Sequence, residues 1–485
     1  MQQVRLELDS NVRRGSNGTA LMGGSPFRLI RLSAAGSQLL NDWLTGTATP
    51  ASSEATKLRD RLIRGGMVHP VFSPVPTNSP EVTSAFVVPV HNDSDGLDRL
   101  LGVLRSYSPE SQIVVVDDAS ADVSSVAAIV AAHGADLVHH DVNRGPAAAR
   151  NTGWRNVLQP KVTSPGDVTF PGDVTFRPEV MVFVDADVVP RAAAIQTLLA
   201  HFVDPAVSVV APRVAAEPGA DRIAAYEADN SPLDMGSDAA LVFPGTRTSY
   251  VPSAMLVVRT NMLEGVGGFD EAMRYGEDVD MVWRLIQHGH LVRFEPAAVV
   301  HHRNRPSVAA FARQRFTYGS SAAELSARHG DKVSPLQLPA NITVTTLGLL
   351  LGGRRLRLVA AAATASGIVA LTRKLTGKVD APAKEAARLT VMTHGYAVHG
   401  LAAAVTRSWA PLLVWTSRSR RALATALVVP AMIDWFRTRP ANNLVTHTAF
   451  RALDHGSYCA GVWAGVLRSR SVAALLPKVR IGNNS

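Results

Sequence analysis

Short apolar runs alternate with helical stretches between residues 85 and 305, and this alternation constrains the fold more than any other feature. The runs are AFVVPV, QIVVVDD, ADLVHH, VMVFVDAD and VSVVAP, and the stretches between them include GLDRLLGVLRSY, VSSVAAIVAAH and GPAAARNTGWRNV. Strands that are apolar on both faces are typical of a parallel sheet covered by helices on both sides. We therefore predict an α/β, Rossmann-like domain over residues 85–330, with ligands at the carboxyl ends of the strands.

A small separate domain is expected over residues 1–75. LSAAGSQLLNDWL has helical apolar spacing behind Ser33 as a cap, ATKLRDRLIRGG ends in two glycines, and MVHPVF reads as a strand. The order helix, helix, strand indicates a winged-helix-like module. A Pro/Ser-rich linker over residues 76–84 follows. The tandem PGDVTF repeat at residues 165–176 is too short for a solenoid and is interpreted as an insertion in a surface loop.

The C-terminal region, residues 331–485, is expected to be helical, alanine-rich and basic. From residue 351 onward there are 19 Lys and Arg against 4 Asp and Glu, a balance of +15, so the rest of the chain carries −6 of the total +9. Such a region could contact an anionic membrane peripherally, a nucleic acid or an anionic substrate. Nucleic acid is the least favoured, because few aromatic residues are interleaved with the basic ones.

Membrane insertion is not the favoured interpretation of this region. The apolar run Leu358–Thr372 has 15 residues, whereas a spanning helix needs roughly 20. Packed or interfacial helices are therefore expected. The single cysteine, Cys459, suits a reducing compartment, and the first residues contain no apolar signal segment. We expect a cytoplasmic protein, with the basic region able to reach the cytoplasmic face of a membrane.

Polar residues follow the first two predicted strands. Asn92 comes after AFVVPV, and Asp117 and Asp118 end QIVVVDD. Carboxylates at a strand end can accept hydrogen bonds from a ribose or a uracil edge. The alternative is that Asp118, with Ser120, caps the next helix, and the residues alone leave both interpretations open.

Two carboxylates follow the buried run VMVFV. Asp185 and Asp187 flank Ala186, so both can converge on one hard cation from the end of the strand. Mg²⁺ and Mn²⁺ prefer oxygen ligands and bridge to phosphate. The sequence therefore predicts a divalent metal site here.

A second acidic pair, Glu277 and Asp278, precedes an apparent helix. Paired carboxylates suit general-base chemistry, because each biases the protonation of the other. The alternative is that they complement the helix dipole. Upstream, GVGGFDE (residues 265–271) predicts a tight, glycine-rich approach to a bound ligand.

Basic and histidine side chains complete the set of candidates. In NRGPAAARN, Arg144 could pair with a base or phosphate, and Arg150 with Asp or phosphate. His301 and His302 end the strand FEPAAVVHH, and one of them could be a third metal ligand.

In this order, VPVHN, VVDDAS, NRGPAAARN, VDAD, GGFDE and YGEDVDMVWRL resemble the GT-A family 2 glycosyltransferases over about residues 86–306. The resemblance implies a GT-A fold, an Mn²⁺ or Mg²⁺ cofactor and a UDP-sugar donor. It implies Asp278 as the catalytic base, with Glu277 beside it, and a metal held by Asp185, Asp187 and His302, with His301 less favoured. The implied nucleotide-sugar contacts are Pro89, Val90, Asn92, Asp117, Asp118, Arg144, Asp185, Ala186, Arg313 and Arg315. The implied acceptor contacts are Gly267, Gly268, Phe269 and Trp283.

One family element departs from its usual form. Many members have a QxxRW segment after the base, whereas the nearest match here is Arg313-Gln-Arg-Phe316, with Phe in place of Trp. This departure argues against a processive, synthase-like acceptor channel.

The whole chain is most similar to the mycofactocin-system glycosyltransferases, on the grounds of LDSNVRRGSNGTALMGGSPFRLIRLSAAG, the transferase motifs and FTYGSSAAELSARHG. This resemblance implies a peptide-derived redox cofactor precursor as acceptor, a β-linked hexose from UDP-glucose and a peptide-binding N-terminal module. An inverting mechanism is expected, because no second carboxylate is needed as a nucleophile. The alternatives are a transferase with a lipid-linked or cell-envelope acceptor, and a non-catalytic sugar-nucleotide-binding scaffold.

Overall fold

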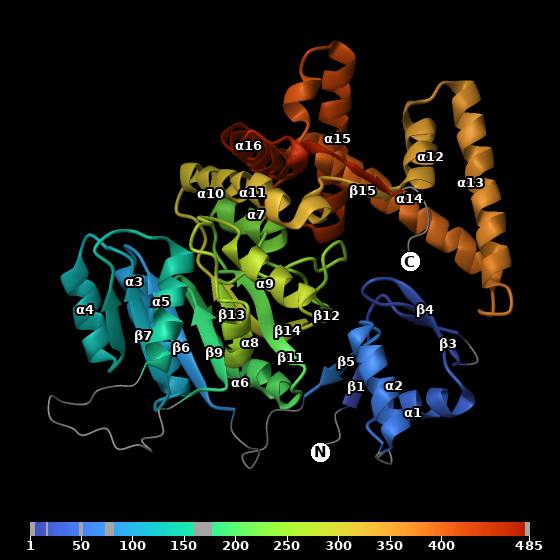
Figure 1. Cartoon of the computed structure of the whole chain (residues 1–485). Helices are drawn as coiled ribbons and strands as arrows, with labels where there is room; N and C mark the ends of the chain where they lie inside the picture. The colour runs from blue at the N-terminus through green and yellow to red at the C-terminus, as the bar shows by residue number, and fades with distance from the viewer. Residues whose placement is uncertain (1–4, 16–17, 48–51, 73–81, 160–176, 481–485) are drawn as a thin grey trace.

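The computed structural model describes residues 5–15, 18–47, 52–72, 82–159 and 177–480 (Figure 1). The PGDVTF repeat and most of the predicted linker lie outside the described residues. The predicted α/β domain is present, and among the described residues its main sheet has nine strands.

The main sheet is mostly parallel, as expected, with an antiparallel part that the sequence pattern did not predict. The strand order is β10-β14-β11-β13-β9-β6-β7-β8, with β12 paired to β14. Strands β6, β7, β8, β9, β11 and β14 share one direction, and β10, β12 and β13 run against their neighbours. In chain order the bounds are β6 Ser84–Val90, β7 Gln112–Asp117, β8 Asp136–His139, β9 Val180–Val184, β10 Val188–Pro190, β11 Val207–Ala216, β12 Ala240–Leu241, β13 Met255–Arg259 and β14 Leu291–His302.

Both faces of this sheet are buried because its strands are apolar along their whole length. In β6, Phe86 and Val88 pack into the core under helices α3 (Ser94–Tyr107), α4 (Val123–Ala132) and α6 (Ala192–Ala200). Ala85 and Val87 pack into the opposite core, under α5 (Pro146–Leu158), α8 (Thr260–Gly265) and α9 (Glu277–Gln287). The period of two along the strand thus divides the core into two layers.

The N-terminal part contains the two predicted helices, α1 (Ala34–Thr45) and α2 (Ser53–Arg64), followed by β5 (Val68–Val71). Ser33 caps α1, as predicted, because its hydroxyl accepts a hydrogen bond from Gly36 N at 3.1 Å. Four strands were not predicted: β1 (Arg5–Leu8) pairs with β5, and β2 (Arg13–Arg14), β3 (Ala20–Gly23) and β4 (Arg28–Arg31) form a separate sheet. The winged-helix-like and peptide-binding character of this part stays a prediction.

Helices α10 (Val308–Ser320) and α11 (Ala322–His329) end the predicted α/β domain. The C-terminal region that follows is helical, as predicted, with α12 (Ala340–Leu351), α13 (Arg354–Leu375), α14 (Pro382–Arg407), α15 (Ser417–Thr438) and α16 (Leu444–Ser469). Two short strands, β15 (Gln337–Pro339) and β16 (Lys478–Arg480), pair in parallel. The remaining elements are α7 (Arg222–Asn230) and 3-10 turns at His201–Val203, Gly330–Val333, Ala410–Leu413 and Ala473–Leu475. Figure 1 shows α10 and α11 over the main sheet, with α12 and α13 projecting away from it.

Helices α10 and α16 touch through glycines. A Cβ atom on Gly461 would lie 2.0 Å from the carbonyl oxygen of Phe316, and one on Gly319 would lie 2.1 Å from that of Tyr458. Only residues without a Cβ allow the two backbones to approach so closely. Helix α16 is thereby fixed to the helix that follows the last strand of the main sheet.

Helix α13 is longer than the apolar run Leu358–Thr372 that it contains. The run has 15 residues, whereas the helix has 22, and 11% of its apolar window is buried. By length and composition it is the one helix among the described ranges that could cross a bilayer.

Candidate active site

The carboxyl ends of β6 and β7 carry a loop held together by two aspartates. Asp118, which is 4% exposed, accepts hydrogen bonds from the backbone N–H groups of Arg144 (2.9 Å) and Gly145 (2.8 Å), and His140 Nδ1 lies 2.8 Å from its Oδ1. Asp117 is fully buried between His139 and the N–H group of Ser120. These carboxylates are therefore occupied by the protein and shape the loop around them.

Asn92 belongs to the same loop, next to Pro89 and Val90 at the end of β6. Its backbone is left-handed (φ 55°), its N–H donates to Ser120 Oγ, and its Oδ1 accepts from Ala121 N. The alternative role of Asp118 as a helix cap is wrong, because Asp122 caps α4 through Ser125 N. The loop thus brings the predicted nucleoside residues of β6 and β7 together at one edge of the sheet.

Arg150 links the two predicted acidic motifs. Its guanidinium, 3% exposed, donates to Asp185 Oδ1 at 2.6 Å and to Glu277 Oε1 at 2.8 Å. Asp185 follows β9 and Glu277 begins α9, so one buried side chain from α5 joins three elements. The sequence predicted an Asp or phosphate partner for Arg150; the structure provides Asp185 and, in addition, Glu277.

The pKa values of these acids move in the direction that burial dictates. Burial raises the pKa of Asp185, assisted by Asp187 and opposed by Arg150. Burial and the neighbouring Asp278 raise the pKa of Glu277, again against Arg150. Arg150 therefore pairs with one acid of each motif. The second acid of each motif, Asp187 or Asp278, opposes the ionisation of the first.

Asp278 is the freer member of the second pair. Its Oδ2 accepts from Ser253 N at 3.1 Å and lies 3.4 Å from Ser253 Oγ, and its Oδ1 accepts from Val279 N at 2.8 Å. Both pair members lie in the first turn of α9, so the predicted complement to the helix dipole is also present. Ser253 carried no signal in the sequence.

Asp187 lies between a histidine and an arginine. His302 Nε2 is 3.2 Å from Asp187 Oδ2, and Arg305 Nη2 is 3.4 Å from the same oxygen. Burial would raise the pKa of Asp187, but His302, Arg305 and Arg303 outweigh it and lower that pKa. His302 reaches this place because it pairs with Val188 across β10 and β14, while His301 faces Val189 one position along.

Oxygen and nitrogen donors of the kind a divalent cation needs are therefore present, but they do not form a closed cage. Among the described residues, no group of three His, Cys, Asp or Glu side chains is arranged to hold a metal ion by itself. Asp187 and His302 face each other, whereas Asp185 turns to Arg150. This half-site fits an ion that takes its remaining ligands from a bound diphosphate, as Mg²⁺ usually does.

The predicted acceptor residues lie elsewhere than expected. Phe269 is 2% exposed and packs edge-on against Phe183, with Asn151 bonded to both its backbone N–H and its carbonyl group. Trp283 is 4% exposed and donates from Nε1 to Ser249 O. Both side chains are core residues, so the expectation that they contact the acceptor directly is corrected.

The two glycines before Phe269 differ in their surroundings. Both Gly267 and Gly268 have positive φ, but a Cβ on Gly268 would lie 2.5 Å from Asn151 Oδ1 and 3.0 Å from Trp154 Nε1, whereas one on Gly267 would meet no described atom within 4 Å. At Gly268 the space predicted for a ligand is therefore filled by side chains of α5.

The arginines assigned to the nucleotide sugar separate into two kinds. Arg315 is 1% exposed, pairs with Glu227 at 2.8 Å and Asp454 at 3.4 Å, and stacks on Phe311. It joins α10 to α7 and α16, and burial excludes it from contact with a nucleotide. Arg144 and Arg313 are exposed, and Arg144 pairs with Glu271 at 2.8 Å. Arg305, which was not among the predicted residues, stands in HHRNRP three positions after His302.

Comparison with known proteins assigns this site to a family. The model of glycosyl transferase family 2 matches residues 85–259, and that of glycosyl transferase family group 2 matches residues 180–436. The pre-mycofactocin glycosyltransferases of Mycobacterium tuberculosis strains CDC 1551 / Oshkosh and ATCC 25618 / H37Rv are each 36% identical over 496 residues, covering 98% of this chain and 97% of theirs.

Among solved structures, the mannosyltransferase PcManGT from Pyrobaculum calidifontis, in complex with GDP-Man and Mn²⁺, is 17% identical, with a TM-score of 0.43, over 81% of this chain and 90% of its own. TarS from S. aureus, residues 1–349 with UDP, is 14% identical, with a TM-score of 0.36, over 80% of this chain and 92% of its own. The family models and the relatives that match nearly the full length lead to one conclusion: the chain belongs to glycosyl transferase family 2, and is a GT-A-fold glycosyltransferase related to the pre-mycofactocin enzymes.

Proposed function

We propose that the protein transfers a hexose from UDP-glucose, with inversion to a β linkage, onto a peptide-derived redox cofactor precursor of the pre-mycofactocin type. The name of the relatives supports the acceptor class. The observation that supports the chemistry is the buried Arg150, which pairs with both Asp185 and Glu277. Asp278 follows Glu277 directly and so lies in the same site.

The donor would lie along the loop at the ends of β6 and β7. Exposed Arg144 and the Asn92 turn would contact the nucleoside, while Asp117 and Asp118 hold the loop in shape from beneath. In this proposal Asp118 is a positioning residue, because its oxygens already accept three hydrogen bonds from the protein.

Asp187 and His302, with Asp185 two residues away, are the residues that would hold Mn²⁺ or Mg²⁺. When bound, the cation supplies positive charge against the leaving diphosphate. Arg305 stands 3.4 Å from Asp187, so a second positive group is available to the same diphosphate.

Asp278 would accept the proton of the acceptor hydroxyl as that oxygen attacks the anomeric carbon. Ser253 orients its Oδ2, and the first turn of α9 fixes its Oδ1. Glu277 is paired with Arg150, which leaves Asp278 as the carboxylate free to act as base. With a single base and no carboxylate nucleophile, attack occurs opposite the leaving group and the configuration inverts.

The test is Asp278→Asn, assayed with UDP-glucose and acceptor by mass spectrometry. We expect UDP-glucose binding by calorimetry to persist while turnover falls by about 10²–10⁴-fold. Asp270→Asn is the matched control and should keep its turnover, because Asp270, eight residues upstream, is a half-buried aspartate that pairs with Arg328. Undiminished turnover of Asp278→Asn would remove Asp278 from the base role, and absence of turnover in the unaltered enzyme with every donor would favour a non-catalytic scaffold.

A lipid-linked or cell-envelope acceptor is the second candidate, favoured by the surface of α12 and α13. Leu351, Leu358 and Val359 are more than 60% exposed, and Arg354, Arg355 and Arg357 lie beside them. Apolar side chains flanked by arginines are suited to an anionic membrane. We propose that the protein is cytoplasmic and that α12 and α13 make peripheral contact with the membrane surface. A mass increment of one hexose on the peptide-derived acceptor, the lipid-linked acceptor or both decides between the two.

A further inference from the structure

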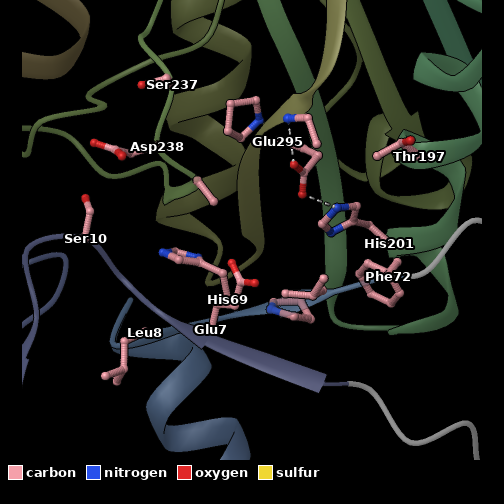
Figure 2. A pocket seen from close by; sticks show the side chains of 15 residues that line it. Glu7, Leu8, Ser10, His69, Phe72, Thr197, His201, Ser237, Asp238 and Glu295 are labelled. Carbon is pink, nitrogen blue, oxygen red and sulfur yellow. Dashed lines mark hydrogen bonds and ion pairs between the residues drawn. The ribbon is translucent and has the colours of Figure 1, made fainter. Parts of the chain in front are cut away.

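A cavity of about 480 Å³ lies between the N-terminal part and the catalytic domain. Figure 2 shows Glu7, Ser10 and His69 on the N-terminal side, and His201 and Glu295 on the side of the main sheet. None of its lining residues belongs to the candidate active site. Its volume is in the range of small-molecule sites in proteins.

An irregularity of β14 forms one wall. Pro212 of β11 pairs with Glu295, but the next residue, Arg213, pairs with Val299, so residues 296–298 have no partner in register. Pro296 and Ala297 line the cavity, and Ala297 N donates to Glu295 Oε1 at 2.9 Å. Bulges of this kind re-aim side chains next to functional sites.

His201 presents an unused acceptor in this wall. It is 3% exposed, its Nε2 lies 3.0 Å from Glu295 Oε2, and its Nδ1 has no hydrogen-bond partner within the described residues. Burial lowers the pKa of His201. Burial would raise the pKa of Glu295, but the hydrogen bonds from His201 and Ala297 oppose it, and that pKa is lowered. Because a carboxylate only accepts, the hydrogen between His201 and Glu295 lies on Nε2, and Nδ1 is left as the buried ring nitrogen without a partner in the described part of the chain.

His69 lies on the opposite wall, where its Nε2 is 2.8 Å from Asp9 Oδ2. The fifteen lining residues include three carboxylates, Glu7, Asp238 and Glu295, and no Lys or Arg. Two arginines outside the lining pair with two of these carboxylates, Arg247 with Asp238 and Arg5 with Glu7 at 3.5 Å.

Apolar surface completes the cavity. Leu8 and Val71 line it, and the ring of Phe72 packs edge-on against His201 with centroids 4.5 Å apart. An anion would be repelled by the three carboxylates of the lining, whereas a cation with N–H donors could bind to carboxylate oxygens that have further lone pairs, with its apolar body against Leu8, Val71 and Phe72.

We propose that this cavity binds an organic ammonium ion with an apolar body, whose N–H groups donate to His201 Nδ1 and to the carboxylates of the lining. A free amine and the amino terminus of a peptide share this chemistry. Because both walls contribute, the ligand would fix the N-terminal part against the catalytic domain. This inference does not depend on glycosyl transfer.

The experiment is calorimetric titration of the full-length protein with phenethylammonium, 2-phenylethanol and 3-phenylpropionate. We expect the ammonium ion to bind at least tenfold more tightly than either isostere, because a charged hydrogen bond contributes about 1.5–3 kcal/mol. The peptide Phe-Gly-Gly and its N-acetyl form distinguish the two sources of the ammonium group. If the free-amine peptide binds, peptide amino termini are among the ligands; if it does not bind, the site takes only small amines.

Two variants assign the binding to this cavity. His201→Gln keeps a donor to Glu295 but removes the Nδ1 acceptor, and Glu7→Gln removes an exposed charge, so both should weaken phenethylammonium binding, the first by at least tenfold. His133→Gln is the control. His133 Nε2 lies 2.8 Å from Asp98 Oδ1, and neither residue lines this cavity. Equal affinity for the alcohol or the acetylated peptide, unchanged affinity in both variants, or no binding up to about 10 mM overturns the proposal.

Discussion

Replacing Arg150 by methionine is the sharpest test of how the candidate active site is built. The change removes two charged hydrogen bonds, of 2.6 Å to Asp185 and 2.8 Å to Glu277, while keeping an unbranched side chain of similar length. Glu277 is 7% exposed, so its charge would stay buried without a partner. Breaking a buried ion pair from one side destabilises a fold by about 3–5 kcal/mol, and we expect a loss of that size.

The pH dependence of this loss is part of the prediction. The pKa of Glu277 is already raised in the folded protein. A carboxyl group of this kind stabilises the fold at low pH, and that contribution is lost as the pH rises through the folded-state pKa. Without Arg150 that pKa rises further, so the loss should be larger at about pH 8 than at about pH 6, by at most about 1.4 kcal/mol per pH unit.

Hydrogen exchange of the amides in β9 is the assay, because it reports opening of the catalytic sheet itself. The matched control is Arg155→Met, five residues along the same helix, where Arg155 is half-exposed and pairs with Glu271 at 3.0 Å. An exposed pair contributes about 0–1 kcal/mol. If both variants lose the same stability, or if Arg150→Met loses less than about 1 kcal/mol, the view of Arg150 as a buried link is refuted.

The remaining predictions concern the metal, the helix contact and the core. Asp187→Ala should raise the Mn²⁺ concentration that gives half-maximal activity by about tenfold or more, and EDTA should stop turnover of the unaltered enzyme until Mn²⁺ is restored; full activity in EDTA contradicts the metal site. Gly461→Ala places a methyl group 2.0 Å from a carbonyl oxygen and should destabilise the protein by about 1–3 kcal/mol in thermal unfolding, whereas Gly456→Ala, with open space around it, should not. Phe269→Ala should lose about 3–5 kcal/mol of stability with the acceptor KM of the folded enzyme unchanged, and a KM effect without destabilisation would return Phe269 to the acceptor site.

Local patterns in the sequence were sufficient to predict where Asp185 and Asp187 lie in the fold. Asp185 and Asp187 follow a buried apolar run, and the end of such a strand in a parallel sheet is a ligand-binding edge. The Ser33 cap is likewise a matter of a few consecutive residues. Short-range geometry determines these features, so a single sequence reveals them.

Side-chain roles that depend on distant packing could not be predicted in the same way. Phe269, Trp283 and Arg315 stand inside family motifs, but a motif does not say whether a side chain faces a ligand or the core, and all three are buried. The partner of Arg315, Glu227, is 88 positions away. Strands such as Arg13–Arg14 are too short to show a period, so their existence depends on pairing alone.

The glycine contact between α10 and α16 bears on how this enzyme can be shortened. The family 2 motifs end near residue 306, which invites a truncated version stopping at residue 330, yet Gly319 and Arg315 of α10 have their partners in residues 454–461. A protein cut there would expose the surface of α10 around Gly319 and leave Arg315 without Asp454, in the helix that follows the strand carrying His302. Helix α16 therefore belongs structurally to the catalytic domain, although it lies far along the chain. A minimal enzyme would have to retain it.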